Sequence, residues 1–299
     1  LTPAFVLVEL NSEGPLRGAY FFDAERGFVA GGERFSETVL QTTDDGGESW
    51  NPIDLEPVFD QTLFDINFFD DQHGVACGIG GKYLFTQDGG KTWRVIQSQY
   101  WQQMQAIAYA DAEKVFAVGG NGYSYGIMER SLNGGQNWAL VDTFDFELRD
   151  VAFVNSSIGF ACGYGVILKS ENGGDSWDFT EARREFFSAL AFPTEQLGYA
   201  VGRTGTIMKT TDQGETWERL RNGNLATNPA HRYHDVSFID PENGYVVGDK
   251  GLIFRTQDGG QTWQRIKLDI KADWWQVQML GGGKTLVCGT AGKILWLEE

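Results

Sequence analysis

One eight-residue segment recurs six times along the chain and constrains the fold more than any other feature. Each copy has Thr or Ser first, Asp or Asn third, Gly fifth, Ser, Thr or Asn seventh and Trp last. The copies are Thr43–Trp50, Thr86–Trp93, Ser131–Trp138, Ser170–Trp177, Thr210–Trp217 and Thr256–Trp263, with tryptophans 39 to 46 residues apart. A period of this length indicates repeated units that each bury an apolar face against their neighbours.

Each repeat is predicted to form four short strands. In the fourth repeat these are Leu148–Val154, Gly159–Gly163, Val166–Ser170 and Trp177–Thr180, where alternating apolar residues are punctuated by glycines. The first strands align in an apolar column of Ala19, Ile66, Ile107, Val151, Leu190, Val236 and Val277. Two residues later comes a second column, of Phe21, Phe68, Tyr109, Phe153, Phe192, Phe238 and Met279. Residues two apart share one face of a strand, so the columns predict buried inner faces.

Seven members per column, against six recurring turns, predict an all-β fold: a seven-bladed β-propeller with four-stranded antiparallel blades. The seventh turn is then the gap between the chain ends, and the N-terminal run Phe5–Leu10 supplies the outer strand that closes the last blade. We expect a single domain over residues 1–299. Its blades are expected at about 14–54, 61–97, 102–142, 147–180, 186–221, 232–267, and 273–299 together with 4–10.

The recurring turn is predicted to stabilise the fold rather than to carry chemistry. Its Asp or Asn can accept hydrogen bonds from backbone N–H groups of the turn. A glycine such as Gly174 can adopt positive φ, and the Trp buries a large apolar area. The turn lacks the twelfth-position Glu of an EF-hand loop, which argues against a calcium site.

Charge excludes several classes of partner. The chain has 24 Lys and Arg against 41 Asp and Glu, a net charge of −17. This argues against nucleic-acid binding and against docking on anionic lipid. No apolar run reaches the ~18 residues of a transmembrane helix. Cys77, Cys162 and Cys288 share a second-strand column with Ala and Val, which predicts buried apolar positions, and we expect no metal or other cofactor.

The recurring turns resemble the Asp boxes of the bacterial neuraminidase repeat. The fuller pattern, clearest in Gly198–Trp217 and Gly244–Trp263, resembles that of the photosystem II assembly and stability factor family over essentially the whole chain. The resemblance implies a seven-bladed propeller, exported to a lumen, periplasm or cell surface, that acts as an assembly scaffold without known catalysis. The first residue is Leu1, so a leader is expected to be missing, and a preceding lipid anchor is left open.

A basic stretch on an otherwise acidic chain predicts a partner-binding face. Residues 183–234 carry seven Lys and Arg against five Asp and Glu. Links between blades and second-to-third strand loops open on one face of a propeller, where such charges attract an acidic partner beside aromatic residues typical of binding hot spots. The candidates are Arg183, Arg184, Arg203, Arg232, His231, His234, Tyr123, Tyr125, Trp101 and Trp274. We expect a monomeric, non-catalytic scaffold for a protein partner, membrane-associated or free.

The alternative is a glycan-binding protein or a glycoside hydrolase of the sialidase or xyloglucanase type. Asp65, Asp150 and Asp235 share one first-strand column near the central channel, where paired carboxylates would be needed. The competing interpretation is that each Asp accepts backbone N–H groups at a strand start. Sialidases also need three arginines around a carboxylate, and the spacing of Arg17, Arg149 and Arg203 does not show whether they converge. The sialidase and xyloglucanase signature motifs are absent, which favours a non-enzyme; a structural module of a larger chain is the third hypothesis.

Overall fold

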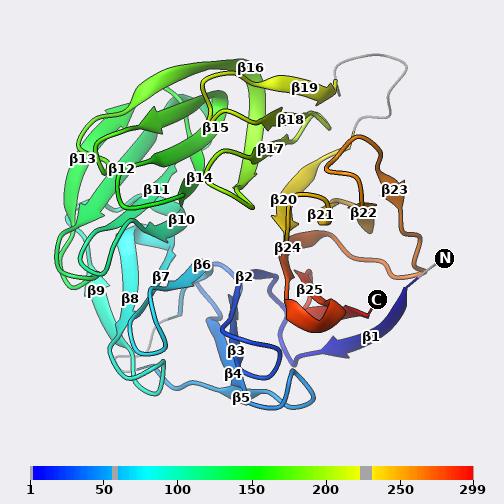
Figure 1. Ribbon diagram of the computed structural model, residues 1–299. Helices are drawn as coiled ribbons and strands as arrows, with labels where there is room; N and C mark the ends of the chain where they lie inside the picture. The colour runs from blue at the N-terminus through cyan, green and yellow to red at the C-terminus, as the bar shows by residue number, and fades with distance from the viewer. Residues whose placement is uncertain (1–2, 56–59, 223–230, 299) are drawn as a thin grey trace.

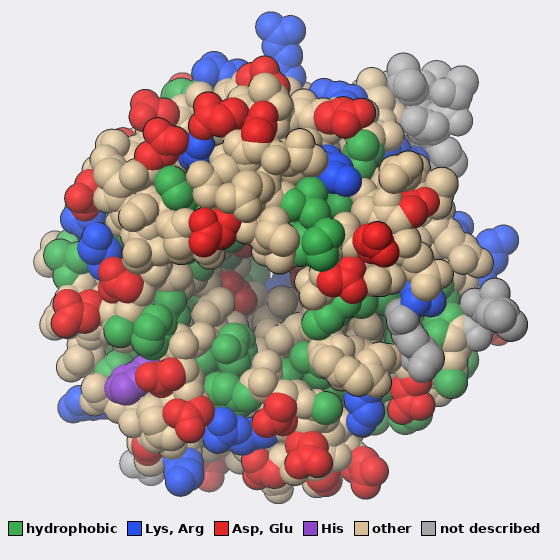
Figure 2. All heavy atoms as spheres, in the orientation of Figure 1, with side chains coloured by type: hydrophobic (Ala, Val, Ile, Leu, Met, Phe, Trp, Pro, Cys, Tyr) green, Lys and Arg blue, Asp and Glu red, His purple; other side chains and the backbone are tan. Residues whose placement is uncertain are grey.

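The computed structural model describes residues 3–55, 60–222 and 231–298. Its strands form antiparallel sheets set radially around a central axis, as a β-propeller (Figure 1). The ring has a hollow at its centre, and acidic and basic side chains lie around its rim (Figure 2). The described helices are three single 3-10 turns: Ile79–Gly81, Gly122–Ser124 and Gly281–Gly283.

Five of the described sheets have four strands each. The first three contain β2 (Leu16–Phe21), β3 (Gly27–Gly31), β4 (Val39–Thr43) and β5 (Asn51–Pro52); β6 (Leu63–Phe68), β7 (Gly74–Gly78), β8 (Lys82–Thr86) and β9 (Arg94–Gln97); and β10 (Gln103–Tyr109), β11 (Val115–Gly120), β12 (Gly126–Ser131) and β13 (Ala139–Phe144). The other two contain β20 (Tyr233–Phe238), β21 (Gly244–Gly248), β22 (Leu252–Thr256) and β23 (Gln264–Arg265); and β24 (Trp274–Met279), β25 (Lys284–Gly289), β26 (Lys293–Glu298) and β1 (Ala4–Glu9).

The sixth sheet has six strands, so the expected count of seven blades is not confirmed. It contains β14 (Leu148–Phe153), β15 (Gly159–Ser170), β16 (Asp178–Ala191), β17 (Gly198–Gly202), β18 (Ile207–Thr210) and β19 (Glu218–Arg221). The sequence predicts a break after Gly163 and another after Thr180, but β15 and β16 continue through both. Pairing of Val166 with Arg183 and of Tyr164 with Phe186, across register shifts, joins the fourth and fifth repeats into one sheet.

The predicted closure by the N-terminal strand is confirmed. β1 pairs antiparallel with β26 from Ala4 opposite Glu298 to Glu9 opposite Lys293. A second contact joins the same part of the ring near the centre, where the Gln278 side chain on β24 meets the backbone of Phe21 on β2. Its Oε1 accepts the Phe21 N–H at 3.0 Å, and its Nε2 donates to the Phe21 carbonyl at 3.3 Å. The two contacts hold the first and last sheets together at the rim and at the axis.

The inner strands form a continuous ring around the axis. β2, β6, β10, β14, β16, β20 and β24 pack in this order, and β24 packs against β2. The first predicted apolar column is buried at every position. In the second column Phe21 and Phe68 are buried, and the other members are partly buried. The three cysteines are free and fully buried, as their alignment with Ala and Val predicts.

The recurring turns share one hydrogen-bond pattern, which agrees with a role in folding. In the first copy the Thr43 hydroxyl donates to Asp45 at 2.7 Å and accepts the Gly47 N–H at 2.9 Å. Asp45 also accepts the Ser49 N–H at 2.9 Å. Gly47 has a φ of 85°, and a Cβ there would lie 2.7 Å from the Trp296 indole nitrogen of the neighbouring sheet. The glycine is therefore required by both conformation and close packing.

Candidate functional site

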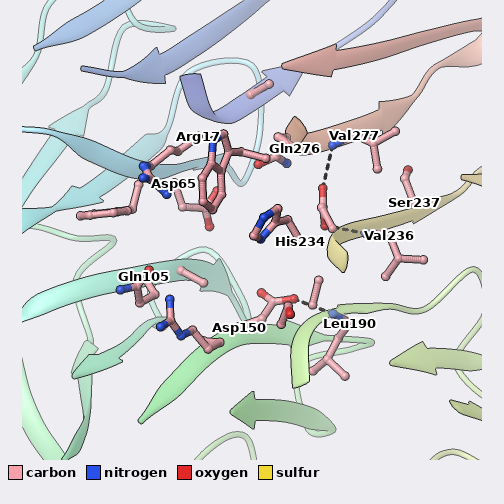
Figure 3. Close-up of a pocket in the computed structure, with 18 of the residues that line it drawn as sticks. Arg17, Asp65, Gln105, Asp150, Leu190, His234, Val236, Ser237, Gln276 and Val277 are labelled. Carbon is pink, nitrogen blue, oxygen red and sulfur yellow. Dashed lines mark hydrogen bonds between the residues drawn. The ribbon is translucent and has the colours of Figure 1, made fainter. Parts of the chain in front are cut away.

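A cavity of about 370 Å³ lies on the axis, and one equivalent position of the inner strands supplies much of its lining. In each inner strand the pairing register with the following strand shifts by one residue, leaving a single unpaired residue. The unpaired residues are Arg17, Phe64, Gln105, Arg149, Ser188, His234 and Trp275, and all of them line the cavity. A β-bulge re-aims a side chain relative to its neighbours. Figure 3 shows Arg17, Gln105 and His234 reaching the cavity from different strands.

Three arginines converge on this cavity. Arg17 and Arg149 come from bulges in β2 and β14, and Arg203 follows β17. Burial lowers the pKa of Arg17 to about 10. The positive charges of Arg149 and Arg203 lower this pKa further, whereas the negative charge of Glu33 raises it. Burial also lowers the pKa of Arg203, again with a contribution from Arg149. Arg149 donates to Glu147 at 2.8 Å, whereas the Arg17 and Arg203 side chains make no hydrogen bond or ion pair with a described residue.

Trp275 contacts both a guanidinium group and an imidazole ring. The guanidinium carbon of Arg17 is 4.1 Å from the Trp275 ring centroid, and the His234 ring centroid is 4.0 Å from it. His234 Nε2 lies 2.5 Å from Asp249, which fixes the imidazole ring. Burial lowers the pKa of His234, with smaller contributions from Arg203 and Arg17, against the raising effect of Asp249. The stack therefore presents donors and one aromatic surface to the cavity.

Three aspartates lie one residue beyond their bulges, and each one joins two inner strands. The two oxygens of Asp65 accept the N–H groups of Ile66 and Ile107, at 2.8 and 2.9 Å. The Asp150 carboxylate accepts the N–H groups of Val151 at 2.8 Å and of Leu190 at 2.7 Å. The Asp235 carboxylate accepts the N–H groups of Val236 and Val277, both at 2.8 Å (Figure 3). Burial raises the pKa of Asp65 to about 8, of Asp235 to about 7 and of Asp150 to about 6, against these hydrogen bonds.

An aromatic groove adjoins the cavity on the face that carries the links between sheets, here called the link face. Tyr123, Tyr164 and Phe186 contact one another, with Tyr164 and Phe186 centroids 4.1 Å apart and Tyr123 and Tyr164 centroids 5.2 Å apart. Arg203 and Arg149 line the same groove. The groove and the cavity therefore adjoin through two shared arginines.

The structure brings some predicted binding residues together. Arg203 lies near Tyr123 and Arg232, both of which contribute to its pKa shift. Trp101 is 75% exposed and Tyr123 58% exposed. Arg183, Arg184 and Arg232 are exposed, whereas Tyr125, His231 and His234 are partly buried. Trp274 is different: it is 1% exposed and packs in the core, so its placement among the surface residues is wrong.

Sequence reasoning missed most of the cavity ring. It named His234 as a binding candidate, treated Arg17 and Arg149 only as unplaced arginines, and chose Trp274 where its neighbour Trp275 lines the cavity. It did not consider Phe64, Gln105 or Ser188. A usable signal exists, because every ring residue lies two positions before the first apolar column. The alignment alone assigns that position to a shared face of the inner strands. The bulge that turns it toward the axis is visible only in the pairing register.

The described part of the chain contains no group of three or more His, Cys, Asp or Glu side chains placed to hold a metal ion. Within residues 3–55, 60–222 and 231–298, no helix combines the length and apolar character needed to cross a bilayer.

Comparisons with known proteins give one family. The family model described as photosynthesis system II assembly factor YCF48 matches residues 48–143, 136–229 and 181–296. The photosystem II assembly lipoprotein Ycf48 of Synechococcus sp. (strain CC9902) is 31% identical over 88 residues, which are 29% of this chain and 25% of that protein. The match therefore spans about a quarter of the length of the curated relative.

Solved structures agree on the fold. A structure described as YCF48 bound to D1 peptide aligns over 100% of both chains with a TM-score of 0.77 and 20% identity. YCF48 from Cyanidioschyzon merolae aligns over 99% of this chain and 98% of its own, with a TM-score of 0.74 and 20% identity. Virginiamycin B lyase from Staphylococcus aureus also reaches 0.77, at 12% identity over 99% and 100% of the two chains. At such identities the likeness shows the fold alone, since one propeller architecture supports unrelated functions.

Proposed function

Because the chain belongs to the YCF48 family of photosystem II assembly factors, we propose that it is a non-catalytic scaffold that binds a protein partner through its link face. The D1 peptide, which the description of one solved relative names, is the first ligand to test. The proposed contact residues are Arg183, Arg184, Arg203, Arg232, His231, His234, Tyr123, Tyr125 and Trp101. Trp274 is left out because its side chain is buried.

The observation that carries this proposal is the groove of Tyr123, Tyr164 and Phe186 beside Arg203. Tyrosine and arginine are the residue types that dominate binding energy at protein interfaces. Exposed Arg183 and Arg184 lie just before Phe186 on β16, so the charged and aromatic parts share one strand. Opposite charge on a partner would raise the association rate and orient the partner over the groove.

The test is capture of partners from a native extract, together with titration of the D1 peptide. Arg183→Glu/Arg184→Glu should weaken binding about tenfold or more at low salt, because it reverses the local field. The matched control is Lys91→Glu/Arg94→Glu, which makes the same charge change at exposed positions beside a recurring turn. Equal binding by both double variants and the wild type would refute the proposal.

Four further expectations accompany this function. We propose that the protein is exported, consistent with the lipoprotein description of the curated relative, and that it is a monomer, which light scattering would check. We also propose that residues 1–299 are one domain and that the six-stranded sheet represents two fused repeats. Seven inner strands around the axis support this count, and an experimental structure with separate fourth and fifth sheets would test it.

A glycan-binding or glycoside hydrolase function remains the alternative, supported by the convergence of Arg17, Arg149 and Arg203 on one cavity. Hydrolysis has less support, because both oxygens of Asp65, Asp150 and Asp235 already accept backbone N–H groups. A hydrolase should cleave chromogenic glycosides and lose that activity in Asp150→Asn. Absence of turnover across a broad panel would leave the scaffold function as the better account.

A further inference from the structure

The side chains at the bulged positions are mostly polar, whereas packing between the inner strands requires only apolar side chains. The residues immediately before them, Leu16, Leu63, Met104, Leu148, Phe187, Tyr233 and Trp274, are all large, apolar and at most 1% exposed. Two positions after the bulge, the first apolar column is equally uniform. The bulged residues themselves include two arginines, a histidine, a glutamine, a serine and two aromatic residues. A position set by apolar packing would show the uniformity of these two columns. The bulged position, like the Gly, Ala, Asp or Gln position directly after it, varies in chemistry, so apolar packing does not set it.

Several polar atoms in this ring are buried and have no partner. Arg17 Nε, Gln105 Nε2 and Trp275 Nε1 are buried, with no hydrogen-bond partner among the described residues. All three are donors, and all three residues line the axial cavity. Buried donors in native proteins are normally paired with protein groups or ordered water, so three donors around one cavity would be satisfied by water or by a ligand that supplies acceptors.

The charges around the cavity define that ligand further. Arg17 and Arg203 bring two positive charges with no ion pair among the residues that the structure describes. The three nearby aspartates make no ion pair with them among the described residues, and their oxygens instead accept backbone N–H groups. A guanidinium group matches a carboxylate in a planar, two-point hydrogen bond. The volume of about 370 Å³ falls in the range of small-ligand sites.

We propose that the axial cavity binds a carboxylate, held by Arg17 and Arg203 with Gln105 and the Trp275 indole N–H as further donors. The buried aspartates nearby favour this singly charged group over phosphate, since each additional negative charge would face their carboxyl groups. The carboxylate comes either from the end of a peptide chain or from a free acidic sugar. This site shares Arg203 with the proposed partner face and extends that face to the axis. Its test does not depend on Arg183 or Arg184, so the two proposals can fail separately.

The test uses the full chain, calorimetric titration and the NMR signal of the Trp275 indole N–H, assigned with Trp275→Phe. The probes are a glycine-serine hexapeptide with a free C-terminal carboxylate, the same peptide as a C-terminal amide, N-acetylneuraminate and inorganic phosphate. Binding of a carboxylate probe should shift the Trp275 signal and leave that of exposed Trp101 in place. The peptide amide and phosphate should bind at least tenfold more weakly.

Arg17→Gln should weaken the carboxylate probe about tenfold to a hundredfold, because a charged hydrogen bond is lost. Arg183→Gln is the matched control and should have no effect. Binding of only the peptide acid identifies a chain end, and binding of only N-acetylneuraminate identifies an acidic sugar. If no probe binds, if phosphate binds equally well, or if Arg17→Gln binds like the wild type, the proposal is wrong. Gln105→Leu, with an expected loss of about three- to tenfold, gives an independent test should Arg17→Gln fail to fold.

This result is separable from the partner-face test. Loss of partner capture in Arg183→Glu/Arg184→Glu with intact carboxylate binding supports both sites. Intact carboxylate binding without any captured partner leaves the cavity site standing and removes the proposed scaffold role.

Discussion

Asp65 is predicted to act as a clip between two inner strands, and its removal should lower the free energy of unfolding measurably. Its oxygens accept the N–H groups of Ile66 on β6 and Ile107 on β10. Asp65→Ala leaves both N–H groups without their acceptor at the wall of the axial cavity. At about 1–3 kcal/mol for each unsatisfied buried group, the expected cost is about 2–6 kcal/mol.

Asp65→Asn keeps the volume of the side chain and changes only its hydrogen bonding. The amide retains one acceptor oxygen and replaces the other with a donor, so about half of the loss is expected, ~1–3 kcal/mol. Asp269→Ala is the control, because Asp269 is exposed, and such changes usually cost less than about 0.5 kcal/mol. The measurement is urea unfolding followed by tryptophan fluorescence and circular dichroism at fixed pH.

The pH dependence of the same variants gives a second measurement. Burial raises the pKa of Asp65 to about 8, from 3.8 as the ordinary value, despite its two N–H donors. The folded state therefore holds this proton more tightly than the unfolded state. The contribution of the group to the unfolding free energy is largest below pH 4 and falls as pH rises to about 8. Asparagine has no such proton, so the difference between wild type and Asp65→Asn should shrink from pH 5 to pH 9.

The clip interpretation fails if Asp65→Ala costs less than about 1 kcal/mol, or if Asp65→Ala and Asp65→Asn have equal unfolding free energies. A difference between wild type and Asp65→Asn that grows with pH would contradict the raised pKa. A loss equal to that of Asp269→Ala would show that the N–H groups find other acceptors.

Four other variants test separate parts of the structure. Deleting residues 1–10 should lower the melting temperature and promote aggregation, since β26 becomes an open edge; an unchanged melting temperature would refute the closure. Thr210→Val removes the acceptor of the Gly214 N–H and should cost about 1–3 kcal/mol in urea unfolding, whereas a neutral result would deny the turn its folding role. Trp274→Ala should lower the free energy of unfolding by about 3–5 kcal/mol. Trp101→Ala should leave that free energy unchanged and weaken partner capture. Equal stability of the two variants would contradict the burial of Trp274 and the exposure of Trp101.

Much of the architecture follows from the sequence because several repeats independently support the same prediction for each strand. The column from Ala19 to Val277 predicts the buried inner face, and the missing seventh turn predicts the pairing of the N-terminal strand. The repeat pattern could not predict whether the fourth and fifth repeats form two separate sheets or one joined sheet. Whether Arg183 pairs with Val166 depends on register between strands, which local residue patterns do not encode.

The candidate site was less accessible to sequence reasoning. Charge counting finds Arg183 and Arg184, which are exposed, and it cannot tell that Trp274 is core while its neighbour Trp275 faces the cavity. Adjacent residues normally point to opposite faces of a strand, but the alignment does not say which of the two faces the axis. Only the bulge in β24 decides between them.

The pairing of β1 with β26 has a consequence for how the protein is made. The strand that completes the last sheet is synthesised first, and its partner is synthesised last. At ribosomal rates of about 5–20 residues per second, β1 waits about 15–60 s for its partner over a chain of 299 residues. During that interval Phe5, Val6 and Leu7 form an apolar segment with unpaired backbone groups. Ring closure is thus a late folding event, and factors that shield β1 before β26 is synthesised should affect the yield of this protein more than that of a propeller closed within one hairpin.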